Sequence, residues 1–211
     1  MSTSQFQEVI TSEEELRELL GFPSELVVRK QLSTLDSHCR NFIAHSPFLL
    51  LGTASADGHY DVSPRGDAPG FVQVLDEKTL LIPERPGNRR LDSLRNILQT
   101  SAAGLLFLIP GVEEILRVNG RAQIIRDRAL LEGMEAQRKL PLAAIALEVE
   151  ECFMHCAKAA KRSHLWDPTT WPERSVIPSL GRILVEQIHP ANTSVADMDA
   201  YLEESYRKRL Y

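Results

Sequence analysis

The sequence predicts a mainly β protein with flanking helices, built on a small antiparallel barrel of six or seven strands. Three observations lead to this fold class. Short apolar runs recur through the middle of the chain, turn signals such as Asp57-Gly58 separate them, and amphipathic segments lie toward both ends. Strands joined by tight turns pair with their neighbours along the chain, so this spacing favours an antiparallel barrel over a βαβ sheet.

Two helices are expected before the first strand. Ser12 and Glu15 have the spacing of a capping box, which predicts a short helix that ends near Leu20. Ser24 would cap a longer helix, because apolar residues then recur at steps of three and four and predict one buried stripe. The residues of this stripe are Val28, Leu32, Leu35, Cys39 and Phe42. We therefore expect the segment 1–45 to pack as helices on a barrel domain that spans 46–211.

The expected strands follow in order from there. Apolar runs bounded by Gly, Pro and Asp predict strands over 48–54, 60–63, 70–75, 79–83, 103–109, 115–125 and 143–154. Helices are expected between and after these strands over 91–100, 127–139 and 155–165. A terminal helix should begin at Ser194, which has capping-box spacing to Asp197.

Composition and charge narrow the class of protein. The formal net charge of −5 gives no general basic field that would attract nucleic acid or an acidic membrane. No apolar run approaches the roughly 18 residues of a membrane span, and the first residues lack a signal-peptide pattern. Three cysteines are an odd, sparse set that is typical of reduced thiols. We therefore expect a cytoplasmic protein that binds any anion through a local cluster of positive groups.

An arginine-rich turn is the main candidate for such a cluster. Pro86-Gly87 should reverse the chain, and Asn88 can cap the helix that follows. Arg89 and Arg90 would then fall in the first helical turn, where the positive end of the helix dipole disfavours cations. A bound phosphate would explain this placement, because helix amides and arginines both donate hydrogen bonds to it. The common dinucleotide and Walker fingerprints are missing from the sequence.

A second loop, Ser63-Pro64-Arg65-Gly66, places another arginine beside proline and glycine. Proline cannot donate to a strand ladder, so pairing should stop there or the strand should lie at a sheet edge. Backbone and side-chain donors would thereby be available to a ligand. An ordinary surface loop is the alternative for both segments: Arg65 would then pair with Asp67, and the arginines of the turn with Glu84 or Asp92.

Together these segments resemble the pyridoxamine 5'-phosphate oxidase-related family of FMN-binding proteins. The similar stretch runs from about residue 47 to 125. It contains, in the family's order, Phe48-Leu49-Leu50-Leu51-Gly52-Thr53, Asp57-Gly58, Ser63-Pro64-Arg65-Gly66, Ile82-Pro83-Glu84-Arg85-Pro86-Gly87-Asn88-Arg89-Arg90, Gly104-Leu105-Leu106-Phe107-Leu108-Ile109 and Arg117-Val118-Asn119-Gly120-Arg121-Ala122. The resemblance implies a split β-barrel of the FMN-binding type, and a homodimer with one FMN in each of two clefts at the subunit interface.

The resemblance also implies roles for single residues. The 63–66 loop would lie along the isoalloxazine ring or the ribityl chain, the backbone of 83–84 would line the ring, and the basic run 88–90 would grip the phosphate. Arg117 and Asn119 would reach the flavin from the neighbouring subunit. The cofactor-binding residues expected from the resemblance are Ser63, Arg65, Gly66, Pro83, Glu84, Arg85, Asn88, Arg89, Arg90, Arg117 and Asn119.

A basic segment in the last third of the chain adds three candidates. Lys158, Lys161 and Arg162 would share one face of a helix, and Trp166 follows at its end. This face could close the flavin cleft, with Trp166 as a flat wall and Lys158 or Arg162 near the electron-rich edge of the flavin. A solvated basic helix with Trp166 in the core is an equally good interpretation.

Two further patterns limit the chemistry. Cys152, His155 and Cys156 have a spacing that could bind a metal ion, but no second pair of ligands accompanies them, so no metal site is expected. True pyridoxamine phosphate oxidases end in an arginine- and tryptophan-containing segment that binds the substrate phosphate. This chain ends differently over 201–211. Vitamin B6 chemistry is therefore not expected.

The leading functional hypothesis is an FMN-dependent oxidoreductase. It would move hydride or electrons between FMN and a small organic substrate or a nicotinamide donor. No catalytic side chain is identified, since the flavin itself carries the redox chemistry. The alternatives are a flavin-binding protein without turnover, such as a redox sensor or flavin carrier, and a protein that binds heme or a deazaflavin in the same cleft.

Overall fold

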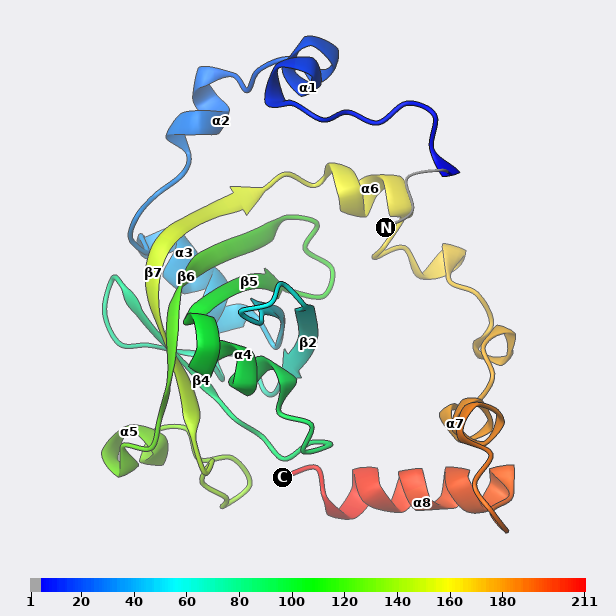
Figure 1. Cartoon of the computed structure of the whole chain (residues 1–211). Coiled ribbons are helices and arrows are strands. Elements are labelled where there is room, and N and C mark those ends of the chain that lie inside the picture. The colour runs from blue at the N-terminus through cyan, green and yellow to red at the C-terminus, as the bar shows by residue number, and fades with distance from the viewer. Residues whose placement is uncertain (1–4) are drawn as a thin grey trace.

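One seven-stranded antiparallel sheet forms the centre of the protein, whose computed structural model describes residues 5–211 (Figure 1). The strand order is β2-β1-β5-β6-β7-β4-β3. The strands are β1 Phe48–Ala54, β2 Tyr60–Gly66, β3 Gln73–Val74, β4 Thr79–Pro83, β5 Ala102–Leu108, β6 Ile115–Ile125 and β7 Ala144–His155. The sheet curls into a barrel. This barrel stays open because its edge strands, β2 and β3, do not pair with each other. The predicted split β-barrel is thus confirmed.

Helices precede, interrupt and follow the strands along the chain. They are α1 Glu13–Leu20, α2 Glu25–Arg29, α3 Ser37–His45, α4 Asp92–Thr100, α5 Arg128–Glu132, α6 Lys158–Ser163, α7 Leu180–Ile188 and α8 Val195–Lys208, with short 3-10 turns at η2 Pro168–Thr170 and η3 Arg174–Val176. Both predicted capping boxes lie at helix starts. Ser12 accepts a hydrogen bond from the Glu15 amide, and Ser194 and Asp197 cap α8 reciprocally. The sequence patterns did not predict α7.

The prediction of one long helix after Ser24 is wrong. α2 ends at Arg29, and Leu32 instead forms an isolated β-bridge with Cys152, with backbone N–O distances of 2.9 and 2.8 Å. α3 then starts independently, because the Asp36 side chain accepts from the Cys39 amide at 2.8 Å. The predicted buried stripe is therefore right only in part: Val28 on α2 is 58% exposed, whereas Leu35 and Cys39 are buried.

The helix expected over 127–139 is also shorter than predicted. α5 ends at Glu132, and Gln137 and Arg138 follow in the left-handed region with φ of 48° and 61°. A bridge between Ala136 and Lys139 closes this turn. Two consecutive left-handed residues cannot continue a right-handed helix, so the chain reverses toward β7.

The core lies inside the curled sheet. Alternate residues of β1, β5, β6 and β7 point inward and are buried, and α3 and α4 cover them with Cys39, Ile43 and Ile97. A smaller cluster, packed under α5, joins Leu81 and Ala146 to Leu131 and Met134. The inward positions follow the period of two that the sequence shows, and they leave the outward positions of the same strands half-exposed.

A bulge in β7 shifts the alternation of this strand by one residue, so that Val149 faces the core before it and Cys152 after it. β6 pairs Asn119 with Glu151 and Gly120 with Val149, so Glu150 is an extra residue. Gly120 is required at this place, because a Cβ there would lie 1.9 Å from the carbonyl oxygen of Glu148. Glu151, Phe153 and His155 therefore share the outward face, while Cys152 faces the core.

The remaining helices extend away from the barrel, as Figure 1 shows for α1, α2, α7 and α8. Of the helices expected to pack within 1–45, α3 enters the core, whereas α1 and α2 bury no residue. α7 packs on α8 through Asp199, which accepts from the Ser179 hydroxyl at 2.9 Å and the Gly181 amide at 3.1 Å. Over residues 5–211, no helix is long and apolar enough to span a membrane.

Candidate functional site

The predicted flavin residues divide between the two faces of the sheet. Ser63 and Arg65 of β2 pair with buried residues of β1, so they lie on the inward face. Arg117 and Asn119 alternate with buried residues of β6, so they point outward. One subunit therefore does not bring all of the predicted residues to a single ligand. Arg117 and Asn119 face away from Ser63 and Arg65 of the same subunit.

The inward group gathers where β2 meets the start of α4. The Ser63 and Ser93 hydroxyls lie 2.9 Å apart, and Ser93 donates to the Asp61 carboxylate. Arg65 donates from Nε to the Ser63 hydroxyl at 3.3 Å, and its guanidinium also contacts the carboxylate of Glu84. The structure thus brings Ser63, Arg65 and Glu84 together. β2 is an edge strand, as Pro64 predicted.

Ser93 is a member of this group that the sequence reasoning missed. It is 3% exposed, although it lies in the first turn of an amphipathic helix. Its position three residues after the arginine-rich turn was a usable signal, since a buried hydroxyl at a helix start needs hydrogen-bond partners. The sequence reasoning also missed Asp61, which accepts the hydrogen bond from Ser93.

Two predicted residues take other positions. Gly66 pairs with Phe48 on the outward face, and a Cβ there would meet the Phe48 ring at 3.2 Å. Pro83 is buried at the end of β4, opposite Ala144 of β7. Only their backbone groups are available to a ligand.

The turn between β4 and α4 differs from the prediction. α4 begins at Asp92 with Leu91 as its N-cap, so Arg89 and Arg90 precede the helix instead of forming its first turn. Asn88 does not cap the helix, because its side chain accepts from the Arg90 amide at 3.0 Å. Arg89 and Leu91 both adopt left-handed φ values, 61° and 60°, which sequence patterns do not reveal for such residues.

The start of α4 nevertheless retains the features of an anion site. Leu91 carries no acceptor, so no side chain caps the first amides of this nine-residue helix. Arg89 makes no side-chain hydrogen bond or ion pair within residues 5–211. Arg90 donates to Asp92 at 2.8 Å, as in the alternative surface-pair interpretation, and is 71% exposed. Left-handed residues without glycine cluster at ligand-binding turns.

Arg85 is committed to the protein itself. Its Nε donates to Asp67 at 2.8 Å, its Nη2 donates to the Met134 carbonyl at 2.9 Å, and its guanidinium lies 5.5 Å from the centre of the Tyr211 ring. Tyr211 in turn donates its hydroxyl to Asp67 at 2.6 Å. The surface-loop alternative paired Asp67 with Arg65, but the structure pairs it with Arg85.

These ion pairs close the open side of the barrel. β2 and β4 are separated by four strands in the sheet order, yet Arg65 contacts Glu84, and Asp67 contacts Arg85. Burial raises the pKa of Asp67, but hydrogen bonds from Tyr211, the Ala68 amide and Arg85 outweigh it and leave this pKa below its usual value.

The outward group lies near the opposite end of β7. The Arg117 guanidinium sits 5.2 Å from the centre of the Phe153 ring, and the Asn119 amide donates to Glu151 at 2.7 Å. Helix α6 carries Lys158 and Arg162, both exposed. Trp166 donates from Nε1 to the carbonyl of Val112 at 2.9 Å.

Trp166 is therefore held against the turn between β5 and β6, half-buried, outside both core clusters. Lys161 pairs with Glu113 of the same turn, which fixes α6 there. Lys158, Arg162 and Trp166 thus lie on a segment held at the β5–β6 turn, and the structure does not bring them to the arginine-rich turn of the same subunit.

The cysteine and histidine pattern does not form a cluster. Cys152 is buried and donates to the Thr34 carbonyl at 3.2 Å, whereas His155 projects from the other face of β7. Across residues 5–211, no group of three or more His, Cys, Asp or Glu side chains is placed to hold a metal ion.

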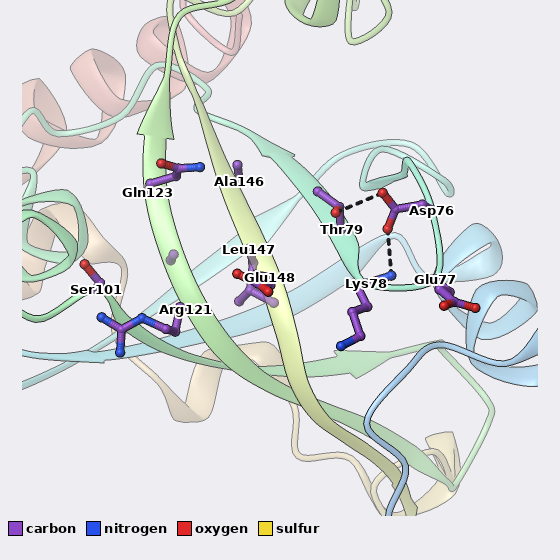
Figure 2. Close-up of a pocket in the computed structure, with 11 residues that line it drawn as sticks. Asp76, Glu77, Lys78, Thr79, Ser101, Arg121, Gln123, Ala146, Leu147 and Glu148 are labelled. Carbon is purple, nitrogen blue, oxygen red and sulfur yellow. Dashed lines mark hydrogen bonds between the residues drawn. The ribbon is translucent and has the colours of Figure 1, made fainter.

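A cavity of about 770 Å³ lies elsewhere, between the β3–β4 turn and the outward faces of β6 and β7 (Figure 2). Its lining mixes cations with carboxylates: Lys78 and Arg121 face the same space as Asp76, Glu77 and Glu148. None of the predicted flavin residues lines it. Because its charges oppose one another, this cavity has no preference for an anion.

Comparison with known proteins assigns the chain. Residues 35–156, more than half of its length, match the family model of pyridoxamine 5'-phosphate oxidase. The chain belongs to this family. The match extends the similar stretch expected from the motifs at both ends, and includes α3 and all of β7. The inward group, the arginine-rich turn and Arg117 all lie within it.

Solved structures show only a distant likeness to this chain. HupZ of Group A Streptococcus is 19% identical with a TM-score of 0.47, over 56% of this chain and 92% of that one. A putative pyridoxamine 5'-phosphate oxidase of Lactobacillus delbrueckii is 25% identical with a TM-score of 0.46, over 59% and 98%. An FMN-binding protein of Syntrophomonas wolfei is 9% identical with a TM-score of 0.43, over 68% and 97%. No curated protein matches the sequence. The family assignment therefore rests on the sequence match.

Replacing Asp67 with asparagine should destabilise the closed barrel. The Asp67 carboxylate is 3% exposed, so the change leaves Arg85 charged without its partner and should lower the free energy of unfolding by about 3 kcal/mol at pH 7. Urea unfolding measures this difference, and Asp57→Asn, at an exposed carboxylate, is the control.

The pH dependence of this difference has a definite sign. The folded-state pKa of Asp67 is lower than its usual 3.8, so its stabilising contribution is complete above pH 3.8 and is lost as the pH falls below that value. The gap between wild type and Asp67→Asn should shrink on acidification. A gap that stays constant from pH 7 to pH 3 would show that the ion pair is not its cause.

Proposed function

We propose that this protein binds FMN between two copies of the chain and uses it to move hydride or electrons. The donor or acceptor would be a small organic substrate or a nicotinamide. One observation carries the proposal: within the segment that matches the family, β2 and the arginine-rich turn converge on an uncapped helix start. Arg89 lies beside these free amides and has no partner of its own within 5–211.

The phosphate of FMN fits this place. The first amides of α4 can donate to its oxygens, and Arg89 supplies a charge-assisted donor. Arg90 is exposed and can exchange its contact with Asp92 for the phosphate. We do not assign Arg85 to the cofactor-binding residues, although it was predicted as one. Its guanidinium already donates hydrogen bonds to Asp67 and to the Met134 carbonyl. It positions the turn instead.

Ser63 and Arg65 extend the site from the phosphate along β2. Their side chains already join the strand to Ser93 and Glu84, so they hold a fixed polar row beside the turn. Such a row suits the hydroxyls of a ribityl chain. The backbone of Pro83 and Glu84 lies next to it, where it can line the ring.

The outward face of the sheet supports a dimer. Phe48, Leu50, Leu106 and Leu108 are only partly covered on this face, and Val62 of the edge strand is 66% exposed. A contiguous apolar face of this kind is typical of a protein–protein interface. A second copy on this face would add its Arg117 and Asn119 to the flavin held by the first.

FMN supplies the redox chemistry when it is bound. The residues of this chain hold its phosphate, fix the polar row beside it and, across the interface, exclude water with apolar side chains. Ser63, Arg65 and Glu84 of the inward group already bind one another or Ser93. We therefore assign none of them as a proton donor in the reaction. The protein thus orients the cofactor, and the cofactor reacts.

Loss of Arg89 and Arg90 should lower the affinity for FMN but not the affinity for riboflavin, which has no phosphate. We expect the double variant Arg89→Ala/Arg90→Ala to lose at least about 30-fold in affinity for FMN, because two charge-assisted contacts are removed. Riboflavin affinity should change little. Titration followed by flavin fluorescence measures both, with Arg95→Ala/Arg128→Ala as an exposed, charge-matched control. Equal losses for the two ligands would show that this turn does not hold the phosphate.

The absorbance spectrum of the purified protein tests the cofactor and the turnover. A flavin spectrum that bleaches with NADH or NADPH and recovers with an organic acceptor is the expected result. A stable flavin spectrum with no reduction by any donor would assign a carrier or sensor role instead. A heme-type or deazaflavin spectrum would replace FMN by that cofactor.

Charge on the outward face should break the dimer. Val62→Glu changes a side chain that is already exposed, so the subunit should still fold, while the interface would bury an unpaired carboxylate. Light scattering should show a monomer with greatly reduced flavin content. Leu142→Glu, in the loop before β7, is the control. A dimeric Val62→Glu protein with full flavin content would exclude this face as the interface.

A further inference from the structure

A cluster of cations surrounds the end of β7 on the outward face. We name it the β7-end cluster: Lys30, Arg117, Phe153, His155 and Lys158. Lys30 follows α2 and is brought to β7 by the bridge between Leu32 and Cys152. No sequence pattern pointed to Lys30, because it lies 123 positions before Phe153.

Phe153 is the centre of this cluster. The Lys30 ammonium lies 5.1 Å and the Arg117 guanidinium 5.2 Å from the centre of its ring. The His155 ring lies 5.1 Å from it at an interplanar angle of 52°. Lys30 also donates to the Met154 carbonyl at 2.8 Å, which fixes its ammonium at the strand. Two cations and two aromatic rings thus share one small region.

The positive charge of the cluster is not neutralised by the protein. Within residues 5–211, neither Lys30, Arg117 nor Lys158 forms an ion pair. The nearest acid along β7, Glu151, accepts its hydrogen bond from Asn119 instead. Like charges held close together repel, and the chain has an overall excess of acids with which to pair them. Their unpaired state indicates a place for an external anion.

His155 contributes an unused polar atom. Its Nε2 is buried and has no hydrogen-bond partner among residues 5–211. Burial, together with the charges of Arg117 and Lys30, lowers the pKa of His155, so the ring is neutral at pH 7. A neutral imidazole with its proton on Nε2 can donate to an anion, and a buried polar atom without a partner is rare in folded proteins.

The neighbouring thiol responds to the same charges. The Lys158 amide, followed by the charges of Lys158 and Lys30, lowers the pKa of the exposed Cys156. Lys158 and Lys30 therefore act on one point, although they come from α6 and the end of α2. Lys158 also begins α6 three residues after His155, the last residue of β7, which places it at the same end of this strand.

We propose that the β7-end cluster binds the carboxylate or phosphate group of a small organic anion, which is the substrate that exchanges hydride or electrons with the flavin. This inference rests on the proposed function, since Arg117 is the residue expected to reach the flavin of the neighbouring subunit. A ligand anchored beside Arg117 would lie next to that flavin. Phe153 and His155 offer it an apolar, aromatic wall.

The cluster is separate from the flavin phosphate site. The arginine-rich turn and Ser63 lie with the inward group, whereas the cluster lies on the outward face at the end of β7. A polyanion such as a nucleic acid would need a wider basic surface than three cations on a chain of net charge −5. A single anionic group matches the size of the cluster.

Calorimetric titration with inorganic phosphate and, separately, acetate tests the site. Both probes are titrated in a chloride buffer into the purified protein and into the FMN-loaded protein. We expect binding of at least one probe to both forms, and the difference between the probes distinguishes phosphate from carboxylate ligands. Lys30→Met should weaken this binding about tenfold, since one charge-assisted contact is lost.

Matched variants control for folding and for general charge. Arg29→Met removes a neighbouring cation that pairs with Glu25 and is 78% exposed, so it should bind like wild type. Lys30→Arg should restore most of the affinity. Thermal unfolding shows whether each variant is folded, and His155→Phe, which keeps the ring packed against Phe153, should also weaken binding.

The outcomes are distinguishable. Equal affinities in wild type and Lys30→Met, or no binding of either probe to either form, would overturn the proposal. Anion binding that FMN abolishes would assign the cluster to the flavin itself and would also overturn it. If FMN never binds but Lys30→Met still weakens anion binding, the anion site stands and the flavin function fails.

Discussion

Two ion pairs across the open side of the barrel organise the rest of this structure. A sheet with the order β2-β1-β5-β6-β7-β4-β3 has no hydrogen-bonded ladder between β2 and β4. Arg65 with Glu84, and Asp67 with Arg85, supply that connection through side chains. They fix the edge strand against the chain that leaves β4, and so determine where the arginine-rich turn and the start of α4 lie. Any ligand held by this turn depends on both pairs.

The strands could be predicted from the sequence, because a period of two in hydrophobicity directly encodes which face of a strand is buried. The turn after β4 could not. Its course depends on left-handed φ values at Arg89 and Leu91, which no residue pattern announces, so the helix start was placed too early. The pairing of Asp67 with Arg85 rather than Arg65 is equally a tertiary result. The position of the turn could be predicted, whereas its individual contacts depend on the fold.

The residues that surround Arg117 were also beyond sequence reasoning. Arg117 could be recognised by resemblance, but its neighbours could not, because Lys30 reaches it only through the bridge between Leu32 and Cys152. The two proposed anion sites differ accordingly. One is built from residues close in sequence around a helix start, and the other from three segments that the sheet brings together. An interface between two copies would place them side by side.

The bulge in β7 determines which changes this architecture can accept. Outward side chains such as Phe153 and His155 can be exchanged one at a time without altering the core, so the ligand can diverge while the barrel stays the same. Loss of the bulge residue Glu150 would only restore a regular ladder with the same partners. Loss of one residue beyond the bulge, such as Cys152, would instead turn the rest of β7 over and direct His155 inward. A new specificity can therefore evolve in this chain by exchange of outward side chains on β7. The number of residues in β7 beyond the bulge, in contrast, is strictly constrained.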